Sequence, residues 1–347
     1  AIYLFSPTRR KNINRYLIFL IFVLLIGLSG RVLYLSEIFG KNFRLIALSE
    51  FAIVLFGSTV YLFTKSSLTV KAPTRRDLLH YLPGIFYILT ITFYYILPSN
   101  EVINSRVRSG ELFLVVSWLT GIGLAVNITY WGLSVRQFLH FRKRLLDELS
   151  YSVKTQFFFN FLLAIGACLF VWSIIYLVSL WNVAFISREI RQAIWLGIAF
   201  IILFIAYYCL SEPELFRQKP LLAVRKYTQS KLSATDLDQL KGRLDQLMED
   251  KKPYLNSKLL KAELANMLDI SNPELARLLN ERIGMNFFEY VNYFRIMEFI
   301  QLAKSDKAHN MTFFGLAQEA GFNSKTTFNK SFKKLMGRTP REYFAKQ

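Results

Sequence analysis

The sequence contains few of the residues that build metal sites or disulfide frameworks, with two Cys and three His among 347 residues. This count excludes a disulfide scaffold and leaves no Cys/His cluster with the spacing of a zinc site. The sequence also lacks a glycine-rich nucleotide loop and a defensible Ser/His/Asp arrangement. We therefore expect neither a cofactor nor an enzyme activity.

Charged residues are scarce too, at 19%, where soluble domains have about 25%. Hydrophobic residues make up 53% of the chain, which excludes intrinsic disorder because disordered chains need low hydrophobicity. Acidic residues are the minority among the charges: 24 Asp+Glu against 43 Lys+Arg give a net charge of +19. The apolar excess lies in residues 1–210, whereas 211–347 has an ordinary soluble composition, so we expect two domains.

Six long apolar runs occupy the first 210 residues. They cover about 14–35, 43–64, 78–97, 110–133, 155–180 and 190–210. A hydrocarbon core about 30 Å thick needs about 20 apolar residues in a helix, and backbone facing lipid must be helical. Helices of a soluble core seldom hold more than about 14 such residues, and no signal-peptide cleavage site follows the first run. The expected fold class is all-α: a polytopic transmembrane helix bundle over 1–210 with six complete spans, followed by a soluble helical domain. We interpret the opening Ala1–Phe5 as the end of an earlier span.

Lys and Arg gather in alternate connections between these runs. The richer set is Arg9, Arg10, Lys11 and Arg15; then Lys65, Lys71, Arg75 and Arg76; then Arg136, Arg142, Lys143, Arg144 and Lys154. Because short cytoplasmic loops are enriched in these residues, the richer set belongs in the cytoplasm. An even number of spans then returns the chain to the cytoplasm, so we expect the C-terminal domain there.

Residues 211–250 form a joint that contains two prolines and then a predicted helix at about 234–250. In that helix Leu237, Leu240, Leu244 and Leu247 recur at intervals of 3, 4 and 3. Two heptads are too few to establish a coiled coil. The helix either packs one face on its own domain or acts as a signalling or dimerisation helix, and the sequence leaves both open.

A helix-turn-helix pattern covers about 257–283. Its two apolar faces consist of Leu260, Leu264 and Leu268, then Leu275, Leu278 and Leu279. Ser271 followed by Glu274 is a capping box with Pro273 in the first turn, which predicts that a second helix begins there. Ala265 is small enough to allow the two helices to cross closely.

The same pattern returns at about 311–335, after a connecting helix at about 286–304. Gly321 supplies a tight turn, and Ser324 is suited to cap the helix that follows. Phe328 and Phe332 lie one turn apart on the predicted buried face. Two such units joined by a helix are far more specific than one.

The residues of the second unit resemble a known family. Ala320–Lys334 followed by Gly337–Tyr343 is similar to the signature of the AraC/XylS transcriptional regulators, GF-S--F---FK and then G-TP--YR. The resemblance covers about 250–347, and with the apolar half the chain resembles membrane-anchored bacterial members that have a multi-span, often seven-helix, sensor. It implies a DNA-binding domain at 251–347, a bacterial inner membrane location, and double-stranded DNA and the lipid bilayer as partners. RNA polymerase, an unidentified small ligand or membrane stimulus, and a second copy of the chain are further expected partners.

The resemblance also assigns roles to residues of each second helix. Base-reading candidates are Asn272, Arg277 and Asn280 in the first unit, and Lys325, Thr326, Asn329 and Lys330 in the second. Arg and Lys can hold guanine and Asn can pair with adenine, whereas the neighbouring Pro273 and Ala276 offer only apolar contact. Lys333, Lys334 and Arg338 are candidates for phosphate contact. Sixteen Lys/Arg against nine Asp/Glu over 251–347 give +7, which favours DNA over a merely solvated face.

Three positions depart from the family pattern. Arg295 of the connecting helix is followed four residues later by Phe299, where the family usually has Ala, and Ile300 replaces a residue that is usually polar. The closing Tyr-Arg is Tyr343-Phe344 here. A large ring in a small-residue position predicts altered packing between the two units or a new contact surface.

Polar residues inside the apolar half are few. Glu50 lies within a predicted span and Arg31 near the outer end of another, so we predict a sensor pair facing the bundle interior near a ligand pocket. Snorkelling of both side chains to the interface is the alternative. Asn127, Tyr130 and Trp131 are more typical of contacts between helices than of a binding site.

These features predict a membrane-bound, sequence-specific DNA-binding regulator that couples a stimulus to transcription through the joint at 211–250. A transporter or intramembrane enzyme with a regulatory tail is the alternative, although the paired carboxylates or broken helices that it needs are not found. A membrane protein whose tail makes only protein contacts is a third reading.

Overall fold

The computed structural model describes residues 15–38, 44–69, 74–153, 155–180, 188–211 and 234–345. All named elements in these ranges are helices, which confirms the expected all-α class. The predicted earlier span before residue 15 and the joint at 212–233 lie outside the described residues. Contacts divide the chain into two units, residues 1–139 with 155–223, and residues 140–154 with 224–347.

Five helical segments of the first unit are long and apolar enough to cross a membrane. They are α2 (Arg15–Leu35), α3 (Leu45–Leu68), a segment at Arg75–Ile96, α6 (Glu111–Glu148) and α7 (Gln156–Leu180). The third combines a 3₁₀ turn (Arg75–Tyr81), α4 (Leu82–Ile91) and a π turn (Thr92–Ile96). The sixth predicted run is α8 (Arg188–Ser211), whose described apolar part, Trp195–Cys209, is shorter.

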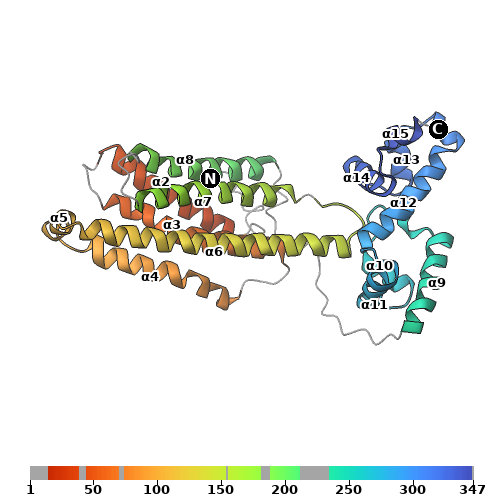
Figure 1. Cartoon of the computed structure of the whole chain (residues 1–347), viewed down its shortest axis with the longest axis horizontal. Helices are drawn as coiled ribbons and strands as arrows, with labels where there is room; N and C mark the ends of the chain where they lie inside the picture. The colour runs from red at the N-terminus through yellow and green to blue at the C-terminus, as the bar shows by residue number, and fades with distance from the viewer. Residues whose placement is uncertain are drawn as a thin grey trace, which may run out of the picture. The chain divides into compact units, whose positions relative to one another are not determined.

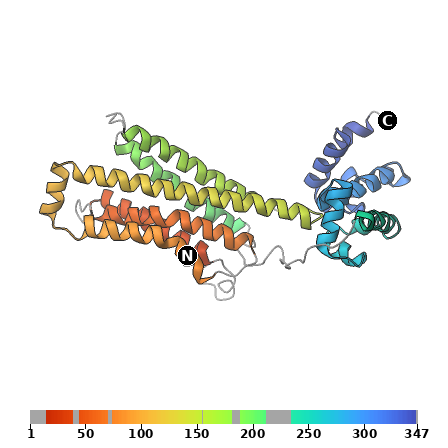
Figure 2. The ribbon, with the colours of Figure 1, turned by 60° about the horizontal axis from the view of Figure 1, so that its bottom comes forward.

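Helices α2, α3, α4, α6, α7 and α8 lie side by side in one bundle, and α5 (Asn100–Arg108) joins α4 to α6 at one end (Figures 1 and 2). Polar side chains connect neighbouring helices, as the sequence predicted for Asn127, Tyr130 and Trp131. Asn127 Nδ2 donates to Ile53 O at 2.9 Å, and Trp131 Nε1 donates to Leu162 O at 2.8 Å. Tyr130 donates its hydroxyl to His80 O at 2.9 Å. These bonds satisfy buried polar groups between helices, which apolar surroundings require.

The second unit contains two hydrophobic cores that meet along α12 (Phe287–Ala303). The first core joins α9 (Ala234–Asp250), α10 (Lys261–Met267) and α11 (Asn272–Leu278) to the first half of α12. The second joins α13 (Phe313–Glu319), α14 (Lys325–Met336) and α15 (Pro340–Phe344) to its second half. Figure 1 shows the two groups of helices at opposite ends of α12.

Helix α9 packs on its own domain. Its four repeating leucines are all buried in the first core: Leu237, Leu240, Leu244 and Leu247. Arg243 donates to Leu268 O at 2.6 Å, and Arg282 lies 3.2 Å from Asp238, so polar contacts also tie this helix to the first helix-turn-helix unit. Of the two readings left open by the sequence, these contacts favour domain packing.

Candidate DNA-binding interface

The two predicted helix-turn-helix units have matching turns. In the first, Asp269 adopts the left-handed region with φ 56°, and Ile270 N donates to Ala265 O at 3.1 Å. In the second, Gly321 adopts φ 95°, and Phe322 N donates to Ala317 O at 2.9 Å. A left-handed residue followed by this backward hydrogen bond ends the first helix of each unit sharply. The predicted turn at Gly321 is confirmed.

The second helix of each unit begins with the predicted cap. Glu274 Oε2 accepts hydrogen bonds from the backbone nitrogen and the hydroxyl of Ser271, both at 2.8 Å. Ser324 accepts from Thr327 N at 3.4 Å. Leu275 and Leu278 of α11, and Phe328 and Phe332 of α14, are buried. Each helix is therefore fixed by its cap and apolar face, which leaves the opposite face for a partner.

The three base-reading candidates of the first unit differ in their exposure to solvent. Asn280 is exposed in the π turn Leu279–Ile283 that continues the helix, whereas Asn272 is only 7% exposed. Arg277 is half-buried, and its Nε lies 3.0 Å from both carboxylate oxygens of Glu281 one turn later. Glu281 was not predicted as a partner of Arg277 from the sequence, although the i, i+4 spacing of the two residues indicates such a pair. Arg277 must share its guanidinium between Glu281 and any base.

Helix α14 presents all of its predicted contacts to solvent. Lys325, Thr326, Asn329 and Lys330, the base-reading candidates, are exposed, as are the phosphate candidates Lys333, Lys334 and Arg338. Lys334 forms an ion pair with Glu289 of α12. That contact holds the pKa of the Glu289 carboxyl below its usual range. The sequence did not indicate this pair, because the two residues lie 45 positions apart.

Arg295 and Phe299 of the connecting helix are both buried. Phe299 contacts the rings of Phe313, Phe328 and Phe332 at centroid distances of 6.1, 4.6 and 5.7 Å. The large ring therefore fills the second core. Arg295 is 1% exposed, and burial lowers its pKa to about 10, which leaves it charged at neutral pH.

The predicted sensor residues lie in the first unit. Glu50 Oε2 accepts a hydrogen bond from Tyr87 at 3.2 Å, and the charge of Arg31 acts on this carboxylate. The Arg31 guanidinium also lies 5.4 Å from the centre of the Trp195 ring. These contacts run between helices of the bundle.

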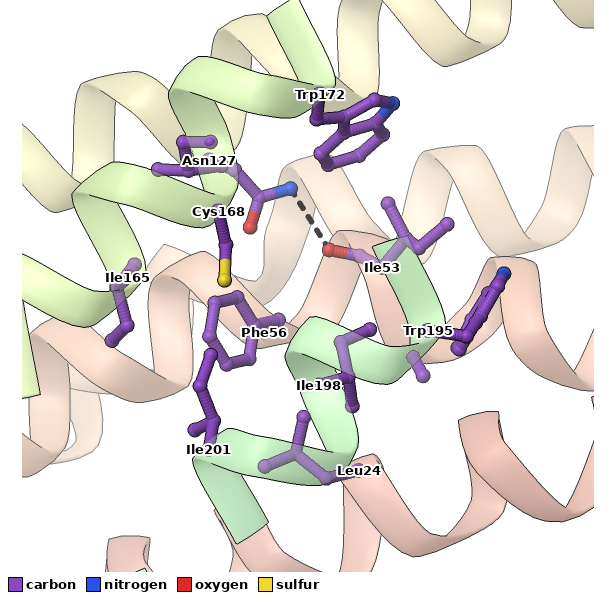
Figure 3. Close-up of a pocket in the computed structure, with 12 residues that line it drawn as sticks. Leu24, Ile53, Phe56, Asn127, Ile165, Cys168, Trp172, Trp195, Ile198 and Ile201 are labelled. Atoms are coloured by element: carbon purple, nitrogen blue, oxygen red, sulfur yellow. Dashed lines mark hydrogen bonds between the residues drawn. The ribbon is translucent and has the colours of Figure 1, made fainter. Parts of the chain in front are cut away.

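Trp195 also borders a small pocket among α2, α3, α6, α7 and α8 (Figure 3). Its walls are mainly apolar, and its volume is about 50 Å³. Asn127 is the one carboxamide in the wall; its Oδ1 makes no hydrogen bond to any described residue. That oxygen lies 2.8 Å from where a Cβ on Gly57 would be, so it faces α3. The pocket thus offers apolar shape and little polar recognition.

Comparison with known proteins agrees with the geometry of the second unit. A family described as a helix-turn-helix domain, of the AraC type, matches residues 264–346. The C-terminal domain is a helix-turn-helix domain. Over 100 residues each, the chain is similar to an uncharacterized response regulatory protein of Staphylococcus epidermidis, at 25% identity, and to the transcriptional regulatory protein HptR of Staphylococcus aureus, at 24% identity.

Each similarity covers 29% of this chain and 38% of the relative. The chain thus spans less than half the length of these curated relatives. No solved structure matches the chain significantly. The likeness to these relatives therefore concerns less than a third of the chain.

Proposed function

We propose that the chain is a membrane-bound, sequence-specific DNA-binding transcription regulator, and not an enzyme. The observation that carries the proposal is the pair of matching helix-turn-helix units, each with a capped second helix. On α14 the exposed side chains include Lys325, Lys330, Lys333 and Lys334. A basic helix that follows such a turn is suited to the major groove of DNA.

The similarity to a protein named as a transcriptional regulator supports the same function. The five helices long enough to cross a membrane support anchoring of this activity at the bilayer. In the proposed arrangement the C-terminal domain lies on the cytoplasmic side, and the bundle with Arg31 and Glu50 receives the stimulus. Because both units belong to one chain, a monomer could reach two successive major-groove segments, about 34 Å apart.

The test separates base readers from phosphate contacts in the full-length protein held in lipid nanodiscs. An operator is first selected from random duplexes by the unmodified protein. We expect Arg277→Ala to cost about 1–3 kcal/mol of binding free energy on the operator and to relax preference at one base position. Lys333→Ala should weaken all sequences alike and reduce the slope of log K against log salt by about one.

Lys241→Ala is the matched control, because Lys241 is exposed on α9, outside both helix-turn-helix units. It should leave affinity, preference and salt slope unchanged. The proposal is wrong if the unmodified protein selects no DNA sequence and its affinity for DNA does not change with salt concentration. Equal, sequence-independent losses in the Arg277 and Lys333 variants would overturn the division of roles.

A further inference from the structure

We propose that residues 140–153, which the sequence assigns to a connection between two membrane spans, are a positioning element for the DNA-reading helices. The proposal rests on the function proposed above and names how that same interface is regulated. These residues belong to the second unit and contact the first helix-turn-helix unit, the connecting helix and the recognition helix α14. They include the last turns of α6, which begins in the first unit. We name them the α6 strap.

The α6 strap is attached first to the start of α10. Glu148 Oε1 lies 2.7 Å from Lys261 Nζ, and the Lys261 side chain is only 6% exposed. Leu149 pairs with Leu260 as an isolated antiparallel bridge. The nitrogen and the hydroxyl of Ser150 both donate to Leu259 O, at 3.3 and 2.7 Å. A largely buried ion pair is costly to break from one side, so this attachment is specific to the residues that make it.

The second attachment is to Arg295 of the connecting helix. Its Nη1 donates to Ser150 O at 2.6 Å, and its Nη2 donates to Ser150 Oγ at 3.0 Å. The other bonds of the guanidinium go to Tyr254 O at 2.7 Å, Asn256 O at 2.7 Å and Asn292 Oδ1 at 3.3 Å. A buried charge needs such acceptors, and two of the five come from the α6 strap. Arg295 therefore holds the strap against the helix that separates the two units.

The third attachment reaches the second helix-turn-helix unit. The hydroxyl oxygens of Ser152 and Thr327 lie 2.6 Å apart. Thr327 is a buried residue in the first turn of α14, next to the exposed base-reading candidate Thr326. Four residues within 148–152 thus contact both helix-turn-helix units and the connecting helix between them: Glu148, Leu149, Ser150 and Ser152. A segment with these attachments sets the angle between α11 and α14, and therefore their spacing along DNA.

The α6 strap is continuous with a helix that crosses the bundle, so its position couples the membrane half to DNA reading. When it is docked, the two recognition helices have the spacing of one operator. When it is released, each unit still has its own core, but the two no longer share a fixed geometry. The regulated quantity is therefore simultaneous engagement of two groove segments, not the fold of either unit.

The test is a charge exchange in the full-length protein in nanodiscs, read by operator affinity and by hydroxyl-radical footprinting. We expect Glu148→Lys and Lys261→Glu each to weaken operator binding about tenfold, within the range of known coupling energies. Each should shorten the footprint from two groove segments to one. The double exchange restores opposite charges, so affinity and the long footprint should return.

Asp147→Lys is the matched control, since it makes the same charge change one residue earlier, and Asp147 makes no ion pair with a described residue. It should keep the long footprint. Ser150→Ala, a milder change that removes only the hydroxyl contacts, should also shorten the footprint without lowering helix content measured by circular dichroism.

The proposal is overturned if the single exchanges keep full affinity and a long footprint, or if the double exchange fails to restore them. Either of these results is informative only when the unmodified protein binds its operator. If the unmodified protein selects no operator at all, the proposed function fails instead, so the two failures are distinguishable.

Discussion

At the residue scale, Arg295 and Gly321 lie against the same backbone segment, at Tyr254. The Cβ of any other residue at position 321 would collide with Tyr254 O and would lie 3.0 Å from Arg295 Nε. The glycine thus lets the second turn approach the segment whose carbonyl accepts from Arg295. The sequence predicted Gly321 from its turn role alone. It could not predict the close approach, because Tyr254 lies far away in the sequence.

Gly321→Ala should therefore destabilise the second helix-turn-helix unit strongly. A left-handed alanine costs roughly 1–2 kcal/mol, and the contact with backbone adds strain that a packed site cannot relieve, so we expect about 3 kcal/mol or more. Gly337→Ala is the control, because Gly337 has φ 72° but a Cβ at this position would meet no atom within 4 Å. Pulse proteolysis of the full chain in urea measures both. Equal losses in the two variants would contradict the close-approach argument.

At the element scale, what could be predicted depended on how local the signal is. The sequence signals for the apolar runs and for both helix-turn-helix units come from residues at most a few helical turns apart. The length of each apolar run, the helix-capping residues and Gly321 therefore identify these elements. The bonds of Ser150 to Leu259 and Arg295 span 109 and 145 residues. No periodicity or spacing indicates such contacts, and loops rich in Arg and Lys look alike whether or not they are docked. The sequence therefore predicts only a cytoplasmic connection at residues 140–153.

The ion pair between α12 and α14 is a further long-range contact, and it bears on affinity. Glu289 forms an ion pair with Lys334, whose side chain is 73% exposed and lies where a phosphate could compete for it. Glu289→Gln should free this lysine and remove a negative charge from the interface, raising affinity for all sequences about two- to fivefold. Glu319→Gln, which releases Lys307 in another exposed pair, is the control and should have a smaller effect. Electrophoretic mobility shift at fixed salt measures the change.

Low pH should weaken the contribution of the Glu289–Lys334 ion pair to the stability of the domain. The folded pKa of Glu289 is lowered, mainly by its hydrogen bond to Lys334, so its stabilising contribution is complete above the ordinary value near 4.5. The contribution is lost as the pH falls through the lowered pKa. Glu289→Gln should accordingly flatten this part of the stability profile below pH 4.5. An unchanged profile would show that other carboxylates account for the acid dependence.

At the scale of the whole molecule, the chain passes between the two units three times, at 139–140, at 154–155 and at 223–224. The last crossing lies in the joint at 211–250, which the sequence favoured as the path of the signal, and the first lies within α6, whose residues 111–139 and 140–148 belong to different units. A helix can carry a rotation or a shift along its axis. The polar contacts of Glu50 and Arg31 lie in the same unit as the first part of α6. In the proposed route, a stimulus that acts on these residues reaches α6 through contacts between α3 and α6, such as the hydrogen bond from Asn127 to Ile53 O, and α6 continues into the α6 strap.

The last prediction tests that path by making α6 flexible where the two units divide. Leu139 and His140 are both exposed, so replacing them together by glycine removes no buried contact but weakens the helix by roughly 1 kcal/mol per site. The control replaces the same two residues by alanine. We expect Glu50→Gln to change reporter transcription at least about twofold in the alanine background, because it removes the carboxylate that accepts from Tyr87 and on which the charge of Arg31 acts. In the glycine background the same substitution should have no effect, although operator affinity in nanodiscs stays equal to that of the control. An equal response in both backgrounds would exclude α6 as the route, and no response in either would remove Glu50 from signalling.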